Sequence, residues 1–402
     1  MHTQVGIIGA GPAGLLLAQM LHRDGIDSVV LENRSEEYVI ERVRAGVLEQ
    51  GSVDLLKSLG VGARLEREGM RHEGIYLSFP AGPDEKTGTR HRIDMAGLTG
   101  GRAITVYGQN EVVRDLIGAR RASGRPLHFE CTDVAVHDFD SPTPRITYNH
   151  NGAAQELTCD YIAGCDGFHG ICRPAIPEGV LTFYDRSYPA GWLGILAEAA
   201  PSSEELVYSC TDRGFALFSM RSPKVTRLYL QCAPDEDIDN WSDDRIWDEM
   251  LRRLTSKDGW KPNVGPIFQK GVTGMRSFVT EPMQYARLFL AGDAAHIVPP
   301  TGAKGLNLAA ADVFHLAQGI AEFYRTGRQG LLDSYSETCL RRVWRAQRFS
   351  WWMTVMLHKF DDPDARTAAF DRKRQLAELE YLCSSRAAMT SLSENYVGLP
   401  IE

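Results

Sequence analysis

The sequence predicts a mixed α/β fold: a Rossmann-like dinucleotide-binding domain, an antiparallel-sheet domain inserted into it, and a helical C-terminal region. Three observations indicate this arrangement. A strand, a glycine-rich turn, a helix and a second strand follow one another within residues 3–32. Alternating strand patterns with aromatic residues occupy 181–275, and strand and helix signals of the first kind return at 287–323. Residues 331–391 are largely helical in pattern.

The length of 402 residues also favours more than one domain, because a single hydrophobic core seldom serves so long a chain. A hairpin pattern at 73–93, with a polar tip at 80–89, lies within the first part. The expected domains are a nucleotide-binding domain in two segments, 1–180 and 276–330, a substrate-binding sheet domain, 181–275, and a C-terminal helical region, 331–402.

Composition and charge exclude several classes of protein. A net charge of -8 opposes nonspecific nucleic-acid binding, and an anionic small molecule would need arginines gathered by the fold. The eight cysteines form no C-x-x-C pair, which argues against a zinc site or a disulfide framework. The sequence shows neither a leader pattern nor a stretch of about 18 apolar residues. We therefore expect a cytoplasmic protein with no metal site and no membrane span.

The first motif joins a strand to a helix through Gly9, Gly11 and Gly14. Glycines at these positions permit a tight turn and let the backbone approach a pyrophosphate at the helix N-terminus. Glu32 ends the next strand, where a carboxylate accepts hydrogen bonds from a ribose. A glycine turn alone is the simpler interpretation, but strand, helix and acid together favour a dinucleotide site.

Two further motifs follow. An apolar strand runs into Asp166-Gly167, followed by His169, and alone this would be an ordinary turn. A second apolar strand ends at Asp293, where a carboxylate can bind a polyol. The helix that begins after Gly305 can direct its N-terminal amides at a developing negative charge.

A possible anion site lies in the inserted domain. Residues 216–229 have the pattern of a hairpin that turns at 223–224. Folding it there places two pairs opposite each other on one face: Ser219 with Tyr229, and Arg221 with Arg227. The facing arginines repel, and a carboxylate would relieve that repulsion. The simpler alternative is a solvated sheet face.

The three motifs, in this order, resemble those of the class A FAD-dependent aromatic hydroxylases. The resemblance implies FAD as cofactor, NADPH or NADH as reducing co-substrate, and dioxygen. It places the following residues at the cofactors: Gly9, Gly11, Gly14, Glu32, Arg42, Arg44, Gln109, Asp166, His169, Arg227, Asp293, Lys304, Gly305, Leu306 and Asn307.

Over nearly its whole length the chain is similar to the 4-hydroxybenzoate 3-monooxygenases of that group. This implies hydroxylation of 4-hydroxybenzoate to 3,4-dihydroxybenzoate through a flavin C4a-hydroperoxide, in the catabolism of aromatic compounds. It also implies a homodimer, with the C-terminal helical region, 331–402, as the expected dimer contact. The implied substrate-carboxylate residues are Ser219, Arg221 and Tyr229, and the implied phenol residues are Tyr208, Tyr396, the carbonyl of Pro300 and, at the outer end of a proton path, His72. Arg227 would lie against the flavin.

The segment after Glu32 bears on the reductant. The NADPH-specific members of the family tend to have a basic residue where this chain has Asn33, and a 2′-phosphate requires cationic donors. Glu36, Glu37 and Glu41 add negative charge nearby, although exposed acids of this kind often have little effect. We expect the protein to use both NADPH and NADH without strong preference.

Two other functions are compatible with the same fold. One is a flavin oxidase or reductase, against which the set of Tyr208, Ser219, Arg221 and Tyr229 argues. The other is a non-catalytic binding protein, as in prenyl-GTPase escort proteins, against which the retained flavin motifs argue.

Overall fold

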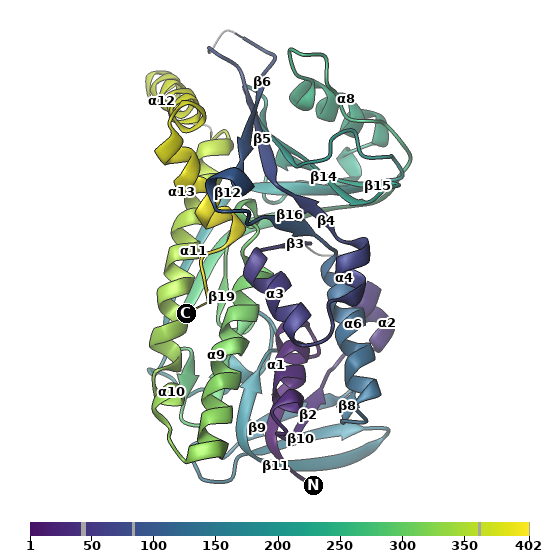
Figure 1. Cartoon of the computed structure of the whole chain (residues 1–402), viewed down its shortest axis with the longest axis vertical. Coiled ribbons are helices and arrows are strands. Elements are labelled where there is room, and N and C mark those ends of the chain that lie inside the picture. Colours follow the sequence, from purple (N-terminus) through teal and green to yellow (C-terminus); the bar gives the residue numbers. More distant parts are fainter. Residues whose placement is uncertain (42–45, 83–84, 361–362, 402) are drawn as a thin grey trace.

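The computed structural model describes residues 1–41, 46–82, 85–360 and 363–401. The molecule is elongated, with one large sheet near each end and a layer of C-terminal helices along one side (Figure 1). A small sheet of β3 (Val47–Leu48), β7 (Ile104–Val106) and β4 (Met70–His72) lies between them.

The nucleotide-binding sheet has the strand order β17-β18-β11-β1-β2-β8, and its central pairs are parallel. The expected strand, helix and strand within 3–32 are confirmed. The strands are β1 (His2–Ile8), β2 (Ser28–Leu31), β8 (Leu127–His128), β11 (Ala153–Gly164), β17 (Gln284–Tyr285) and β18 (Leu288–Leu290), with β9 (Thr132–His137) and β10 (Arg145–His150) extending β11.

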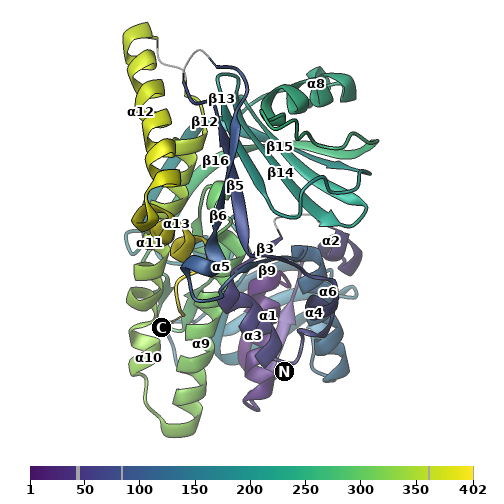
Figure 2. The same cartoon turned by 45° about the horizontal axis from the view of Figure 1, so that its top comes forward.

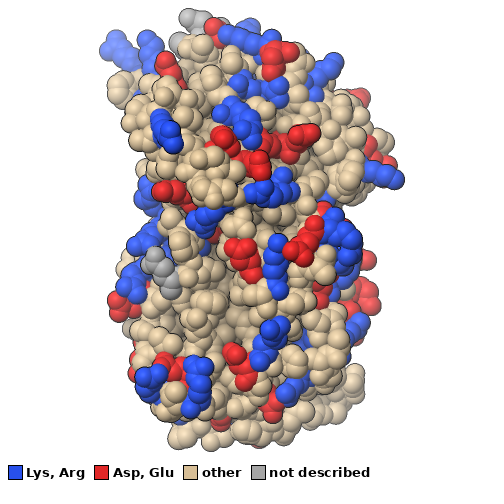
Figure 3. All heavy atoms as spheres, in the orientation of Figure 1, with Lys and Arg blue, Asp and Glu red and all other residues tan. Residues whose placement is uncertain are grey.

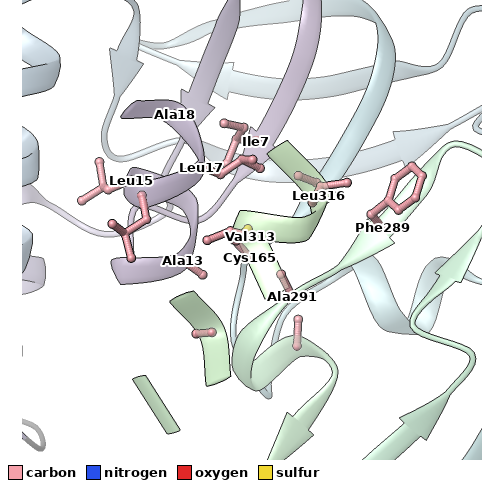
Figure 4. Close-up of a cluster of buried hydrophobic side chains, with 14 of the residues drawn as sticks. Ile7, Ala13, Leu15, Leu17, Ala18, Cys165, Phe289, Ala291, Val313 and Leu316 are labelled. Carbon is pink, nitrogen blue, oxygen red and sulfur yellow. The ribbon is translucent and has the colours of Figure 1, made fainter. Parts of the chain in front are cut away.

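Two long helices, α1 (Pro12–Arg23) and α9 (Gly305–Thr326), pack together on this sheet. Their contact is apolar, and Figure 4 shows Leu17 of α1 and Val313 and Leu316 of α9 converging beside β1. Because the glycine turn precedes α1 and the Asp293 turn precedes α9, this packing brings two predicted motifs together. The other helices of this region are α2 (Glu36–Glu41), α3 (Gln50–Ser58), α4 (Ala63–Glu68), α6 (Gln109–Ala122) and α7 (Cys172–Ala175).

The second sheet has the order β19-β16-β12-β15-β14-β13-β5-β6. Its strands are β5 (Gly74–Phe79), β6 (Thr89–Asp94), β12 (Thr182–Ala197), β13 (Val207–Thr211), β14 (Gly214–Ser222), β15 (Val225–Cys232), β16 (Ile267–Glu281) and β19 (His296–Ile297). The hairpin predicted at 73–93 joins this sheet through parallel pairing of β5 with β13. The segment 1–180 therefore contributes strands to both sheets, and β16 continues past 275.

The two faces of the second sheet have different partners. One face packs on α8 (Asp243–Leu254), with Phe218 and Met250 both fully buried in the contact. The opposite face packs against the C-terminal helices, and Figure 2 shows α8 and α12 on opposite sides of the strands. The remaining helices are α5 (Met95–Leu98), α10 (Gly330–Asp333), α11 (Tyr335–Leu357), α12 (Ala365–Ser384) and α13 (Arg386–Val397). Within the described ranges, no helix combines the length and apolarity that crossing a membrane requires.

Truncation of a core side chain between the sheet and α8 should be costly. Phe218 is 0% exposed, so we expect Phe218→Ala to lower the free energy of unfolding by about 3–5 kcal/mol. Phe268, 53% exposed on β16, provides the control, and Phe268→Ala should change stability by about 0.5 kcal/mol or less. Urea denaturation of both variants measures the difference, and equal losses would contradict the assignment of this core.

Candidate functional site

The glycine turn between β1 and α1 has the geometry of a phosphate cradle. Gly9 has a φ of +104°, and a Cβ there would lie 2.3 Å from the carbonyl oxygen of Cys165. A Cβ at Gly14 would lie 2.0 Å from the Gly9 carbonyl oxygen. Gly11, by contrast, faces open space at the N-terminus of α1, which has no side-chain cap. A pyrophosphate fits beside these amides.

Glu32 lies at the end of β2, directly beside this turn. Its carboxylate accepts hydrogen bonds from the backbone amides of Ala10, at 2.8 Å, and Arg34, at 2.9 Å. The side chain is 9% exposed. Glu32 therefore fixes the glycine turn, and it lies where the dinucleotide motif places the ribose.

Asp293 is half-buried in the short turn between β18 and β19. Behind it, a carboxylate oxygen of Asp312 on α9 accepts from the Gly292 amide at 2.9 Å and contacts His296 Nε2 at 2.7 Å. Both members of this ion pair are buried. This pair holds the Asp293 turn against α9. That helix begins at Gly305, and its N-terminus has no side-chain cap.

Asn307 in the first turn of α9 bonds to protein through both amide atoms. Its oxygen accepts from the amide of Glu49, at 2.9 Å, and from the hydroxyl of Ser52, at 2.8 Å. Its nitrogen donates to the carbonyls of Val47, at 3.1 Å, and Ala303, at 2.8 Å. The side chain holds β3 and α3 against α9, so any contact of Asn307 with FAD is made beside these bonds. Leu306 and Gln109 are both half-buried, at the starts of α9 and α6.

The Asp166 turn is tightly folded. Asp166 accepts from the Cys172 amide at 2.9 Å, and burial raises the pKa of its carboxyl. His169 is exposed and packs its ring on Phe168, with centroids 5.0 Å apart. The same Phe168 lies under the guanidinium of Arg276, 4.5 Å from the ring centroid. Sequence reasoning missed Arg276, since β16 is brought to this turn only by the tertiary fold.

The second sheet aligns the predicted substrate residues on one face. Tyr208 pairs with Leu217, Leu217 with Tyr229, and Tyr229 with Gly194 of β12. Residues directly opposite one another in antiparallel strands point to the same side. Tyr208, Leu217 and Tyr229 therefore share the face turned away from α8, with Leu217 between the two tyrosines.

The predicted register of the hairpin is wrong by two residues. Ser219 pairs with Arg227, and Leu217 rather than Ser219 lies opposite Tyr229. The turn itself has two residues, because Ser222 pairs with Val225, and the register shifts between Met220 and Ser222. Arg221 is thus the extra residue of a β-bulge, which also overturns its predicted pairing with Arg227. A shift of two leaves Ser219 on the expected face.

Arg221 is a cation in a confined position. Burial lowers the pKa of its guanidinium to about 10, with Tyr229 raising the pKa and Arg227 lowering it further. A Cβ at Gly46 would lie 2.2 Å from Nη1 of Arg221, so the guanidinium lies directly over that glycine. Arg227 in turn stacks on the Tyr229 ring, 5.0 Å from its centroid. An anion at this point would offset both the burial and the repulsion.

Tyr208 and Tyr396 meet at the other end of the face. Their hydroxyls are hydrogen-bonded, and Tyr208 donates to the carbonyl of Thr301 at 3.3 Å. Because each hydroxyl has one proton, Tyr396 donates to Tyr208 in this arrangement. Burial raises both pKa values, so both phenols are neutral. Pro300 is exposed and its carbonyl accepts from the Ala303 amide, and its predicted contact with the substrate hydroxyl stays a prediction.

A buried ion-pair cluster positions the segment that carries Tyr396. Lys304 donates to a carboxylate oxygen of Glu49 at 2.6 Å and to the carbonyl of Asn395. Arg342 bonds the second Glu49 oxygen at 3.1 Å and the carbonyl of Pro400 at 2.8 Å. The ammonium of Lys304 therefore points toward the C-terminal segment, and its predicted contact with cofactor stays a prediction.

His72 on β4 is 1% exposed, and burial lowers its pKa to about 4. Neither ring nitrogen has a hydrogen-bond partner among the described residues. The structure thus places a neutral histidine in a buried position, without a direct bond to Tyr208 or Tyr396 among the described residues. Two other predicted residues, Arg42 and Arg44, lie outside the described residues.

Comparison with known proteins agrees with this geometry. The family described as "FAD binding domain" matches residues 2–350. The p-hydroxybenzoate hydroxylase of Acinetobacter baylyi is 49% identical over 402 residues, which cover 100% of this chain and 96% of that protein. The rifampicin monooxygenase of Streptomyces venezuelae is 29% identical over 82% of this chain and 66% of its own. The structure of p-nitrophenol 4-monooxygenase from Pseudomonas putida shares the fold, with a TM-score of 0.81 over 99% of both chains at 19% identity.

The chain belongs to this family of FAD-dependent aromatic hydroxylases. The hydroxylase is a flavoprotein monooxygenase, and FAD is its cofactor. Its own residues fit that cofactor, since the glycine turn, Glu32 and the uncapped N-termini of α1 and α9 provide backbone donors and a ribose acceptor. The expectations of a mixed α/β fold and of an enzyme are confirmed.

The buried cluster predicts a large effect of removing its anion. Glu49→Ala leaves Lys304 and Arg342 facing each other, so we expect a loss of about 3 kcal/mol in unfolding free energy. Residues 395–401 should also become accessible to protease. Glu66, which pairs with Lys57 at the surface, is the matched control, and Glu66→Ala should cost less than about 1 kcal/mol. Equal stability of the two variants would contradict a structural role for Glu49.

Proposed function

We propose that this hydroxylase converts 4-hydroxybenzoate to 3,4-dihydroxybenzoate with FAD, NAD(P)H and dioxygen. The observation that carries the proposal is the sheet face with cations at one end and paired phenols at the other. Support also comes from the 49% identity to the p-hydroxybenzoate hydroxylase of A. baylyi over the whole chain.

The dimensions of this face suit a single para-substituted ring. Tyr208 and Tyr229 lie on strands separated by β14 alone, so their backbones are about 10 Å apart, twice the interstrand spacing. Leu217 between them provides an apolar floor. A ring with a carboxylate toward Arg221 and a hydroxyl toward Tyr208 fills this space and places the carboxylate beside a cation.

The carboxylate end is formed by three donors. Arg221, Ser219 and Tyr229 can each donate a hydrogen bond, and only Arg221 is charged. A negative charge bound here would raise the pKa of Arg221, which burial lowers. We assign substrate orientation to this end, since the charge fixes which ring carbon faces the flavin.

The phenol end moves a proton. Loss of the substrate's phenol proton makes the adjacent ring carbon more nucleophilic, and Tyr208 is placed to accept a hydrogen bond from that hydroxyl or donate one to the phenolate. Tyr396 extends the relay from Tyr208, and the apolar surroundings exclude water. When bound beside the glycine turn and reduced by the nicotinamide, FAD would activate dioxygen, of which one atom goes to the ring and the other leaves as water.

Product analysis tests the function directly. The purified protein, incubated with NADPH or NADH, oxygen and a panel of hydroxybenzoates and aminobenzoates, should form 3,4-dihydroxybenzoate from 4-hydroxybenzoate in preference to other products. Oxygen uptake without a hydroxylated ring would instead support an oxidase.

We also propose a cytoplasmic homodimer. All eight cysteines are free, as is usual in a reducing compartment. Several large aromatic side chains are exposed on α11 and α12, the elements expected to form the dimer contact: Trp344, Trp351, Phe370 and Tyr381. On the face drawn in Figure 3, acidic and basic residues are interspersed, which is unlike a nucleic-acid surface. Sedimentation analysis measures the oligomeric state, and a monomer at micromolar concentration would contradict the dimer.

Removal of the pocket cation should weaken substrate binding. We expect Arg221→Ala to lose about 1.5–3 kcal/mol of binding free energy for 4-hydroxybenzoate in a flavin-fluorescence titration, because a charge-assisted contact disappears. Lys224, exposed at the tip of the same hairpin, is the control, and Lys224→Ala should bind normally. Unchanged affinity in Arg221→Ala would reject the carboxylate assignment.

Removal of the phenol partner should uncouple reduction from hydroxylation. Tyr208→Phe retains the ring but not the hydroxyl, so the variant should bind FAD and consume NAD(P)H while releasing peroxide. Hydroxylation should fall far more than reduction. Tyr188→Phe is the control in the same sheet, because the hydroxyl of Tyr188 bonds Ser277 at 3.0 Å and not Tyr396. A full product yield per reductant consumed by Tyr208→Phe would show that Tyr208 does not activate the phenol.

We propose that both reductants serve, without strong preference for NADPH. Asn33 is exposed and offers no cation, Glu36 is paired with Arg121, and Glu37 and Glu41 are exposed on α2. Exposed charges act weakly, so these acids do not exclude a 2′-phosphate. The kcat/KM ratio of NADPH to NADH, at saturating 4-hydroxybenzoate and equal ionic strength, should stay below about a hundredfold, nearly 3 kcal/mol.

A further inference from the structure

Behind the proposed pocket, an aromatic stack adjoins both substrate tyrosines. Trp192 of β12 packs on Tyr229, with ring centroids 4.7 Å apart. Phe215 of β14 packs on Tyr208, with centroids 6.1 Å apart. Trp192 and Phe215 lie nearly parallel, 5.1 Å apart and 9° between their planes. The orientation of these two rings therefore determines the space available to each tyrosine.

His358, at the end of α11, closes this stack. Its ring lies 4.4 Å from that of Phe215 and 5.9 Å from that of Trp192, close to parallel with both. The Trp192 indole Nε1–H donates to Nε2 of His358 at 2.7 Å. His358 is 1% exposed and Trp192 is 4% exposed, so water does not replace this bond.

Only one protonation state of His358 satisfies its surroundings. Nδ1 lies 2.9 Å from the Thr354 carbonyl oxygen, which can only accept, so Nδ1 carries the proton. Nε2 then presents a lone pair to the indole. Burial lowers the pKa of His358 to about 3, which agrees with a neutral ring. A protonated ring would have two donors and would break the bond to Trp192.

The same turn of α11 also contacts the phenol end. The hydroxyl of Thr354 donates to the Ser350 carbonyl at 2.7 Å and accepts from the hydroxyl of Thr301 at 2.9 Å. Thr301 is the residue whose carbonyl receives the hydrogen bond of Tyr208. One turn of α11 thus contacts both Thr301, whose carbonyl accepts from Tyr208, and, through His358, the Trp192 ring that packs on Tyr229.

We propose that His358 is a positioning residue of the pocket: its Nε2 lone pair holds the Trp192 indole, and through Trp192 and Phe215 it sets the orientation of Tyr229 and Tyr208 toward the substrate. The proposal rests on the function proposed above. His358 does not touch substrate in this arrangement, and its role is carried by the two rings it orients.

The test separates the hydrogen bond from the ring stacking. His358→Phe keeps the stack but removes the acceptor, so the buried indole N–H loses its partner. We expect the dissociation constant of 4-hydroxybenzoate to rise about tenfold, with a lower product yield per NAD(P)H and normal FAD content. His358→Gln restores an acceptor near the Nε2 position and should recover most of the affinity. His91→Phe, at a histidine stacked on Phe79 at 4.7 Å, is the control and should bind normally.

A double variant shows whether His358 acts through Trp192. In a Trp192→Phe background the donor is absent, so adding His358→Phe should change substrate affinity little further. The proposal is overturned by normal affinity in His358→Phe, by His358→Gln binding no better than His358→Phe, or by additive losses in the double variant.

The unmodified enzyme provides an independent readout if His358→Phe fails to fold. In ¹⁵N spectra, with the His358 signal assigned by its loss in His358→Gln, the ring should be the Nδ1–H tautomer from about pH 5 to 8. A protonated ring or the Nε2–H tautomer overturns the proposal. If the wild-type protein formed no product from 4-hydroxybenzoate, the proposed function would fail while this spectrum still decided the state of His358.

Discussion

The position of Tyr396 depends on the buried contact between Lys304 and Glu49. Lys304 lies at the start of α9 and Glu49 at the start of α3, and the ammonium of Lys304 also donates to the carbonyls of Asn395 and Tyr396. Burying one charge without the other would be strongly unfavourable, so the two must come together with the segment that completes their hydrogen bonds. The phenol end of the pocket follows from that requirement, because Tyr396 reaches Tyr208 only from this docked helix.

The carboxylate end is organised by a different constraint. Side chains alternate along a strand, so Tyr208, Ser219 and Tyr229 share a face as soon as β13, β14 and β15 pair. The same face must then be covered, and α11 covers it with the buried side chains of Phe349, Met353, Met356 and Leu357. The phenol end thus depends on a buried ion pair and the docked C-terminal helix, whereas the carboxylate end depends on strand pairing and the cover of α11. Neither end is formed by a single loop.

The parts of this fold that sequence reasoning predicted are those governed by short-range rules. The glycine turn, its helix and Glu32 lie within a continuous βαβ segment, and the glycines are required by close backbone approach. The face shared by Ser219 and Tyr229 was predicted even though the register was wrong, because an even shift preserves sidedness. The bulge at Arg221 was not predictable, because the one-residue offset arises in the pairing of β14 with β15 and leaves no mark on the sequence pattern. Likewise, Lys304 and Asn307 have partners more than 250 residues away, which no local pattern reveals.

The two long strands β12 and β16 have a mechanical consequence. They pair along nearly their whole length, from Thr182 opposite Glu281 to Ala197 opposite Ile267, and β16 also pairs with β19 directly after the Asp293 turn. The cofactor turn is therefore joined to the substrate sheet by a continuous hydrogen-bonded ribbon, about 50 Å long at 3.3 Å per residue, and not by a loop. A ribbon of this kind resists stretching and bends most easily at its two irregularities, between Ser187 and Gly191 and between Leu196 and Ala197. Relative movement of the two sheets should deform the first of these, which separates the part of the ribbon beside β19 from the rest. The flavin turn can therefore move sideways relative to the substrate sheet more easily than it can move along the strands.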